Sequence, residues 1–167
     1  WTTTPWTLPG NQAIAAHPDF IYELVATERG ALILAADLRQ ACLDRYGLEA
    51  KRVLGRATGV ALEGLAFRHP LEPRDVPMVL GEHVTLEAGT GLVHTAPAHG
   101  AEDFDMGVKY RLPLEQPVDD QGRFKAGVPH FAAMGVREVE KPLVELLATK
   151  GALLKSESLR HSYPHCW

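Results

Sequence analysis

Cysteine is nearly absent from this sequence, and so are long apolar runs. Cys42 and Cys166 are the only cysteines among 167 residues, too few for a disulfide framework and typical of a reducing compartment. Cys42 lies in a predicted amphipathic helix and is expected to pack in the core. No run of about 18 apolar residues occurs, so the sequence predicts no membrane span. We expect a cytoplasmic protein with no membrane partner.

An excess of positive charge is also missing, since the formal net charge is −4. A protein that grips nucleic acid through its own phosphate contacts is usually basic. If this chain acts on RNA, other parts of a larger protein must supply most of the grip. Signal peptides and low-complexity tracts are absent as well. The chain runs from Trp1 to Trp167, and we interpret residues 1–167 as a single domain cut from a longer protein.

Short apolar runs between glycine and proline turns predict many strands. The expected strands are Ala13–Ala16, Tyr22–Thr27, Ala31–Leu34, Arg52–Leu54, Leu65–His69, Val76–Leu80, Gly91–Thr95 and a closing strand Leu153–His161, with a hairpin over Val118–Phe124. Helical spacing predicts helices at Asp37–Tyr46, Ala101–Tyr110 and Val139–Thr149. The opening residues 1–11 are expected to be extended. This order predicts a mainly β fold with α insertions, a small closed β-barrel decorated by about three helices.

Hydroxyl side chains are concentrated in the opening segment WTTTPWTLPGN, residues 1–11. Thr2, Thr3, Thr4 and Thr7 each offer one donor and two acceptor positions, and the prolines restrict the backbone. Such a segment can be rigid and still present polar groups to a ligand. The alternative is a threonine-rich edge strand without a ligand, and the pattern alone leaves both open.

Imidazoles and carboxylates follow a predicted strand in the segment GTGLVHTAPAHGAED, residues 89–103. The strand delivers His94 to its carboxyl end, a Pro/Gly loop carries His99, and Glu102 and Asp103 begin a helix. Together they form a reasonable site for binding or catalysis. Alternatively, the two acidic residues only favour the helix N-terminus through its dipole, and His94 is a half-buried strand residue.

A metal centre is a further alternative for His94, His99 and Asp103. These side chains suit a His-His-carboxylate site, but the five-residue gap crosses a proline loop and is not a standard ligand spacing. No HExxH or paired CxxC motif occurs. We therefore expect no metal and no cofactor in this domain.

The remaining histidines carry weaker signals. Those beside prolines or charged residues in loops are expected at the surface, namely His17, His69, His83 and His130. At the C-terminus, His161, His165 and Cys166 form at most half of a zinc site completed outside this sequence, which is no evidence for a metal here.

Taken together, the two long motifs resemble the inserted editing domain of the isoleucyl-, valyl- and leucyl-tRNA synthetases. That family pairs an early threonine-rich stretch with a later GTG…H.AP.HG..D stretch, and both are complete here. WTTTPWTLPGN is similar to the isoleucyl branch, because the valyl and leucyl branches carry Arg after the threonine pair, where this chain has Thr4. The ending HSYPHCW, residues 161–167, also resembles the isoleucyl enzymes. The resemblance spans the chain, although residues 20–80 carry little signature.

The resemblance implies a role for each motif residue. Asp103 would pair with the α-ammonium of the wrong amino acid, the threonines and Trp1 would hold the ester and a water, and Asn11 would support that loop or the terminal ribose. His94 would lie where the correct, larger side chain would have to fit. The implied catalytic set is Thr2, Thr3, Thr4, Asn11, His94 and Asp103. The implied substrate-binding set is Trp1, Thr2, Thr3, Thr4, Thr7, His94, Thr95, Ala96 and Asp103.

The implied activity is hydrolysis of valine from tRNA(Ile), and of valyl-adenylate as a second substrate. The implied partners are the tRNA 3′ end carrying valine and the remainder of the synthetase chain. A hydrophobic pocket distinguishes one methylene by only about 10–200-fold, as is established for enzymes of this type, so a second hydrolytic site is needed. An aminoacyl ester is already activated, and placement and electrostatics suffice to hydrolyse it.

Three other functions remain open from the sequence. The chain could be the editing domain of a valyl- or leucyl-tRNA synthetase, against which Thr4 argues. It could be a metal-dependent hydrolase that uses His94, His99 and Asp103. It could also be a passive tRNA-binding module that has lost catalysis, although the threonine stretch and Asp103 show no erosion.

Overall fold

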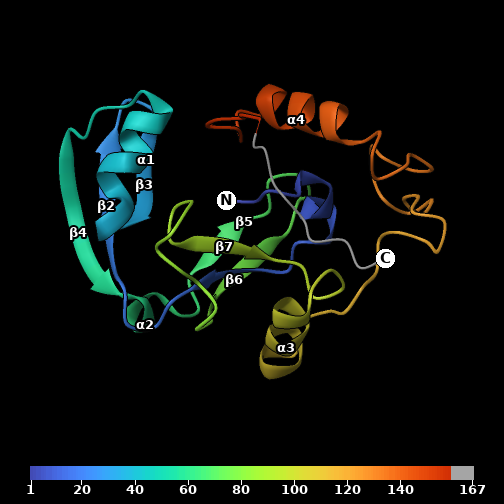
Figure 1. The fold of residues 1–167 in the computed structure, drawn as a ribbon, viewed down its shortest axis with the longest axis horizontal. Coiled ribbons are helices and arrows are strands. Elements are labelled where there is room, and N and C mark those ends of the chain that lie inside the picture. Colours follow the sequence, from blue (N-terminus) through green and yellow to red (C-terminus); the bar gives the residue numbers. More distant parts are fainter. Residues whose placement is uncertain (159–167) are drawn as a thin grey trace, which may run out of the picture.

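The computed structural model describes residues 1–158, and residues 159–167 lie outside the description. A four-stranded sheet forms its centre, in the order β5-β6-β1-β7 (Figure 1). The strands are β1 (Ala13–Ala16), β5 (Ala66–Arg68), β6 (Asp75–Leu80) and β7 (Leu92–Thr95). β1 runs parallel to β6 and antiparallel to β7, with Ile14 opposite His94. This register places the end of β7 beside the chain that leads into β1.

A second sheet has the order β3-β2-β4 and lies to one side of the first (Figure 1). It contains β2 (Ile21–Thr27), β3 (Gly30–Ala35) and β4 (Arg52–Thr58). β2 and β3 form a tight hairpin, in which Thr27 pairs with Gly30 and its hydroxyl donates to the Gly30 carbonyl. Helix α1 (Arg39–Tyr46) packs on this sheet and ends at Gly47, whose φ of 65° suits a residue without a Cβ.

The remaining helices surround the central sheet. They are α2 (Gly59–Leu62), α3 (Ala101–Tyr110), α4 (Glu140–Thr149), and the 3₁₀ helices η1 (Pro5–Gly10) and η2 (Ala36–Leu38). Figure 1 shows α4 and α3 on opposite sides of the sheet. α4 lies beside η1 and buries Leu143 and Leu147 in a cluster with Phe124 and Phe131. The η1 part of the threonine-rich segment therefore packs against α4, a helix about 130 positions later in the chain.

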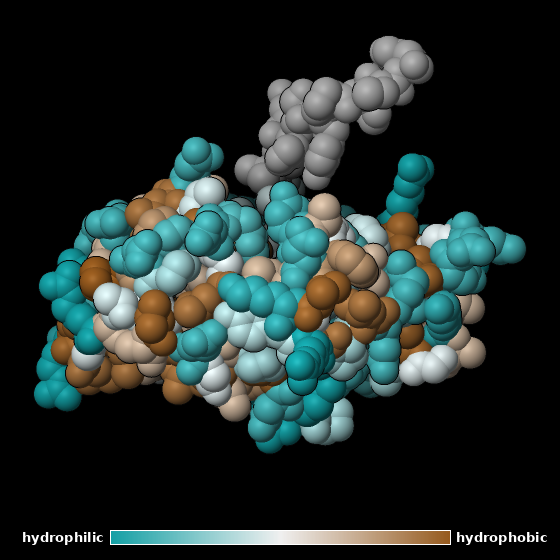
Figure 2. All heavy atoms as spheres, turned by 90° about the horizontal axis from the view of Figure 1, so that it is seen from below, coloured by the Kyte–Doolittle hydropathy of each residue, from teal (hydrophilic) through white to brown (hydrophobic). Residues whose placement is uncertain are grey.

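Among residues 1–158, no helix is long and apolar enough to cross a membrane. Figure 2 shows hydrophobic residues scattered among hydrophilic ones on the face turned toward the viewer. α3 has its apolar side chains Phe104 and Val108 exposed at 48% and 58%.

Most predicted elements are present with small shifts at their ends. The three predicted helices are confirmed as α1, α3 and α4, and α3 has the predicted bounds. Cys42 is confirmed as a core residue, packed with Val25, Leu34 and Leu43. The hairpin expected over Val118–Phe124 is reduced to a single bridge between its end residues.

Two expectations for local structure are wrong. Residues 5–10 form a 3₁₀ helix instead of the expected extended segment, because the φ that proline imposes at Pro5 and Pro9 also suits 3₁₀ geometry. The strand expected from Leu153 is missing over residues 153–158, and the rest of that range lies outside the description. The closed barrel is not confirmed either, since the described strands form two separate sheets.

Candidate functional site

A pocket of about 230 Å³ lies between the threonine-rich segment and the carboxyl end of β7. It brings together residues from the two motifs, which are about 90 positions apart in the chain. Its lining consists of Trp1, Thr2, Thr3, Thr4, Thr7, Val93, His94, His99 and Asp103. Seven of the predicted site residues therefore share one cavity, while Asn11, Thr95 and Ala96 do not line it.

The GTG sequence before β7 fixes one edge of this pocket. Gly89 has a φ of 79°, and a Cβ there would come within 2.7 Å of the Trp1 ring. Gly91 meets Ala35 of the second sheet, where an added Cβ would lie 2.4 Å from the alanine methyl. Tyr22 also donates its hydroxyl to the Gly91 carbonyl at 2.7 Å. Both glycines are thus required by close approaches, Gly89 to Trp1 of the pocket lining and Gly91 to Ala35 of the second sheet.

The threonines organise their own segment. The Thr4 amide donates to Thr2 Oγ1 at 3.1 Å, and the Thr7 amide donates to the Thr4 carbonyl at 3.0 Å. Thr7 is buried and Thr3 is exposed, so the hydroxyls differ in their access to a ligand. The segment is therefore linked internally by its own hydrogen bonds.

His94 is held by hydrogen bonds at both ring nitrogens. Asn11 Nδ2 donates to Nδ1 at 2.9 Å, so the ring proton resides on Nε2. Nε2 donates to Thr7 Oγ1 at 2.7 Å, and the Thr7 hydroxyl in turn donates a hydrogen bond to the Thr4 carbonyl at 2.9 Å. Burial is the main cause that lowers the pKa of His94 to about 4. The imidazole is therefore neutral and fixed, with no free nitrogen for a proton or a metal ion.

Asp103 presents a half-anchored carboxylate at the start of α3. Its Oδ2 accepts from the Ala96 amide at 2.8 Å, and no hydrogen bond within the described residues involves Oδ1. Burial is the largest cause that raises the pKa of Asp103. A cationic group that entered the pocket would find a fixed, partly desolvated anion.

The three predicted site residues outside the lining lie directly behind it. Asn11 is 4% exposed and binds His94, with a further bond from Nδ2 to the Ala13 carbonyl at 2.9 Å. Thr95 and Ala96 are fully buried, and the Ala96 amide orients Asp103. These residues act on the pocket through the side chains that line it.

His99 lines the pocket without a hydrogen bond at Nε2, which is buried. The ring packs edge-on to Trp6 with centroids 4.9 Å apart and lies against Gly10, where a Cβ would approach it to 3.3 Å. His94, His99 and Asp103 do not form a ligand set. In residues 1–158 no three His, Cys, Asp or Glu side chains are grouped so that they could hold a metal ion.

A larger hollow of about 740 Å³ adjoins the pocket and shares Trp1, Thr2, Thr3 and His94 with it. Its other wall comes from α4 and from residues 152–158. The small pocket therefore opens beside a space that is large enough for a much bigger group.

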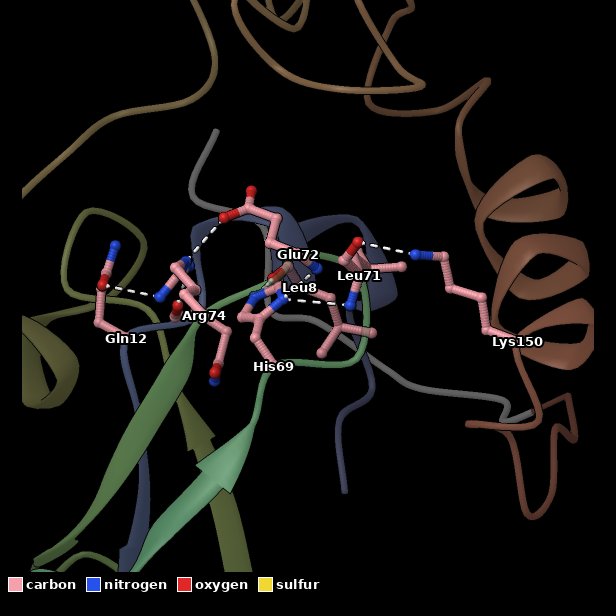
Figure 3. Close-up of polar contacts among 8 residues, drawn as sticks. Leu8, Gln12, His69, Leu71, Glu72, Arg74 and Lys150 are labelled. Atoms are coloured by element: carbon pink, nitrogen blue, oxygen red, sulfur yellow. Dashed lines mark hydrogen bonds and ion pairs between the residues drawn. The ribbon is translucent and has the colours of Figure 1, made fainter.

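The sequence did not predict the contacts that the loop between β5 and β6 makes with η1 (Figure 3). His69, predicted at the surface, is only 2% exposed. Its Nδ1 accepts from the amides of Leu71 and Glu72, and its Nε2 donates to the Leu8 carbonyl at 3.2 Å. The prediction failed because proline and charged neighbours say nothing about a contact with η1, some 60 positions away.

Comparison with known proteins links this geometry to one family. A family model described as the editing domain of leucyl-tRNA synthetase matches residues 2–137. The chain is 55% identical to the isoleucine–tRNA ligase of Thiobacillus denitrificans over 168 aligned residues, and 54% identical to that of Chromobacterium violaceum over 167. Both alignments cover all of this chain and 18% of the ligase, so the chain spans less than a fifth of these relatives.

Solved structures share the fold. The crystal structure of GlLeuRS-CP1 matches with a TM-score of 0.72 and 16% identity, covering 98% of this chain and 83% of that one. The editing domain of the P. knowlesi cytosolic leucyl-tRNA synthetase matches with a TM-score of 0.69 and 11% identity, covering 90% and 80%. At such low identity the likeness concerns the fold alone.

Proposed function

Since this chain belongs to the family of tRNA synthetase editing domains, we propose that its pocket hydrolyses the ester between tRNA(Ile) and a wrongly attached valine. The observation that carries the proposal is the pocket, whose lining combines a half-anchored Asp103 carboxylate with four threonines. A substrate with an α-ammonium next to an ester carbonyl matches those two features. The similarity to isoleucine–tRNA ligases over the whole chain supports valine as the amino acid.

Each part of the pocket has a role in this mechanism. Asp103 Oδ1 takes the ammonium, which places the ester carbonyl among the hydroxyls of the threonine-rich segment. A hydroxyl positions a water, whose oxygen attacks the carbonyl carbon. The tetrahedral intermediate then expels the ribose oxygen, which takes up the proton from the water and leaves valine and free tRNA. Placement of a water against an activated ester is the main contribution to rate.

His94 serves as a wall in this mechanism and not as a base. Its two nitrogens are occupied by Asn11 and Thr7, and its pKa of about 4 keeps it neutral. A wall is needed because attraction favours isoleucine, whose extra methylene is worth about 0.8 kcal/mol of burial. Overpacking by one methylene costs about 1–3 kcal/mol, which reverses that order.

The adjoining hollow supports a polymeric substrate. A valyl group fills a small pocket, while the nucleotides that carry it need the larger space beyond Trp1 and Thr2. Valyl-adenylate, which carries the same ammonium and an equally activated carbonyl, is a second substrate of the same site.

The test is deacylation of pre-charged valyl-tRNA(Ile) and isoleucyl-tRNA(Ile) by the full-length protein that contains this domain. We expect the wild type to hydrolyse the valyl ester and spare the isoleucyl ester. The His94→Ala variant should begin to hydrolyse isoleucyl-tRNA while it still cuts valyl-tRNA. If the variant loses valyl activity and gains none toward isoleucyl-tRNA, His94 is not the wall. A wild type without valyl activity would refute the function itself.

A further inference from the structure

Arg74 ties the loop between β5 and β6 to the end of the threonine-rich segment (Figure 3). Its Nη2 donates to the Asn11 carbonyl at 2.6 Å, and its Nη1 donates to Gln12 Oε1 at 3.1 Å. Its Nε donates to Glu72 Oε2 at 2.7 Å. Each guanidinium nitrogen has a different partner, which requires a planar fork and cannot be reproduced by the single ammonium of lysine.

The loop that carries Arg74 is itself fixed from two sides. His69 is buried beneath it, accepts from two loop amides and donates to the Leu8 carbonyl. Lys150, at the end of α4, donates to the Leu71 carbonyl at 2.9 Å (Figure 3), and Leu71 packs in the α4 cluster. Arg74 therefore reaches the threonine-rich segment from a loop that is bonded to both η1 and α4.

The contacts of Arg74 lead to the pocket through one residue. Arg74 holds the carbonyl of Asn11, and the side-chain amide of Asn11 holds Nδ1 of His94 at 2.9 Å. Gln12, the next residue, also donates its amide to the Thr95 carbonyl at 2.8 Å. Arg74 is absent from the lining of both cavities, so it influences the pocket only through Asn11 and Gln12.

We propose that Arg74 is a positioning residue of the editing pocket, which fixes Asn11 and thereby the orientation of His94 that excludes isoleucine. The inference rests on the proposed editing function. It assigns a role in specificity to the part of the sequence, residues 20–80, that carried no recognisable motif.

The experiment replaces Arg74 by Gln in the full-length protein and measures deacylation of both charged tRNAs. A displaced His94 should leave kcat and KM for valyl-tRNA within about twofold, because the wall does not touch the reacting atoms, and should speed hydrolysis of isoleucyl-tRNA, which the wall no longer excludes. The ratio of isoleucyl to valyl hydrolysis should rise by about tenfold, and Arg74→Lys should give an intermediate ratio.

A double-mutant cycle separates positioning from general destabilisation. If Arg74 acts through His94, then Arg74→Gln changes the ratio in the wild type and leaves it unchanged in the His94→Ala background. An equal change in both backgrounds overturns the proposal. The matched control is Arg68→Gln, which removes the same charge from an exposed ion pair with Asp75 and should change neither activity nor ratio.

A crystal structure of the Arg74→Gln protein tests the same claim without any substrate. A lengthened contact between Asn11 Nδ2 and His94 Nδ1 supports positioning, and an unchanged contact overturns it. This measurement remains decisive even if the wild type fails to hydrolyse valyl-tRNA, a result that would refute only the editing function.

Discussion

At the scale of single residues, the site depends on two partly buried groups whose pKa values are shifted in opposite directions. Burial lowers the pKa of His94 and raises the pKa of Asp103, and each has a hydrogen bond that selects one form. The neutral imidazole shapes the pocket, while the carboxylate supplies its charge. Replacing either side chain therefore tests a different property of the pocket.

The charge of Asp103 is tested by Asp103→Asn, which retains an oxygen to accept from the Ala96 amide. Loss of a charge-assisted bond worth about 1.5–3 kcal/mol should lower kcat/KM for valyl-tRNA by about 10–150-fold. Because burial raises the folded pKa above the unfolded value, the ionised carboxylate costs stability at neutral pH, and the Asn variant should be at least as stable as the wild type. Deacylation kinetics and melting temperature measure both effects.

The control for this variant is Glu102→Gln, an exposed carboxylate one position earlier in α3. It should leave kcat/KM unchanged. An equal loss in the two variants would mean that overall negative charge matters, and not the anchored carboxylate.

The pH dependence of stability tests the burial of His94. Its folded pKa of about 4 lies below the unfolded value near 6.5, so the unfolded state binds more protons between these limits. Stability should therefore fall as the pH drops from 6.5 to 4, with a contribution from His94 of about 3 kcal/mol. His69 and His99 have lowered pKa values and act in the same direction.

The contribution of His94 is isolated by urea unfolding of the wild type and of His94→Gln between pH 4.5 and 7. In the variant, the free energy of unfolding should change less steeply with pH than in the wild type, whatever its absolute value. His130→Gln, at an exposed position, serves as the control and should keep the full slope. Identical slopes in all three proteins would contradict a buried, neutral His94.

At the scale of elements, the threonine-rich segment of residues 1–11 contributes both to the lining of the pocket and to the hydrogen bonds that support it. Thr7 is buried and bonded to His94 and Thr4, whereas Thr3 is exposed and lines the pocket. These contacts predict different effects for the replacement of Thr7 and of Thr3.

Thr7→Val should lower the free energy of unfolding by about 1–3 kcal/mol, because it leaves the buried Nε2–H of His94 without an acceptor. Thr3→Val should leave the free energy of unfolding unchanged and lower valyl-tRNA hydrolysis. Denaturant unfolding and deacylation of the two variants check this division. Equal destabilisation by both variants would show that the whole segment is scaffold.

At the scale of the whole molecule, the pocket exists because two sheets and α4 meet around the first eleven residues. His94 reaches them from β7, Asp103 from α3, and the supporting loop from between β5 and β6. Catalysis by such an assembly depends on placement, and no metal is part of the proposed mechanism.

Treatment of the protein with EDTA followed by dialysis should therefore leave valyl-tRNA hydrolysis unchanged. The reason is that both nitrogens of His94 already have protein partners and that residues 1–158 offer no grouped ligand set. Activity that is lost to the chelator and restored by zinc would instead favour a metal-dependent hydrolase. The assay should include MgCl₂ in excess during deacylation, so that chelation of the Mg²⁺ that RNA needs is not mistaken for loss of a catalytic metal.

Comparison of the predictions with the structure shows which signals are local. Helix α3 was predicted with its bounds because acidic residues at its start and a 3.6-residue period lie within ten positions. The family was also recognisable, because its two motifs are continuous in the sequence and both line the pocket, and the match to editing domains confirms it. The closed barrel was not confirmed, since sheet closure depends on pairing between distant strands.

The sequence by itself determined most of the strands, the three longer helices, the family and most of the pocket lining, since each of these is encoded by neighbouring residues. Only the tertiary structure decided that His94 is a neutral imidazole bonded at both ring nitrogens, because its partners Thr7 and Asn11 lie 87 and 83 positions away. The burial of His69 and the role proposed for Arg74 depend likewise on contacts across 61 and 63 positions. Protonation and orientation follow from desolvation and from hydrogen-bond partners, and the fold alone brings those partners together.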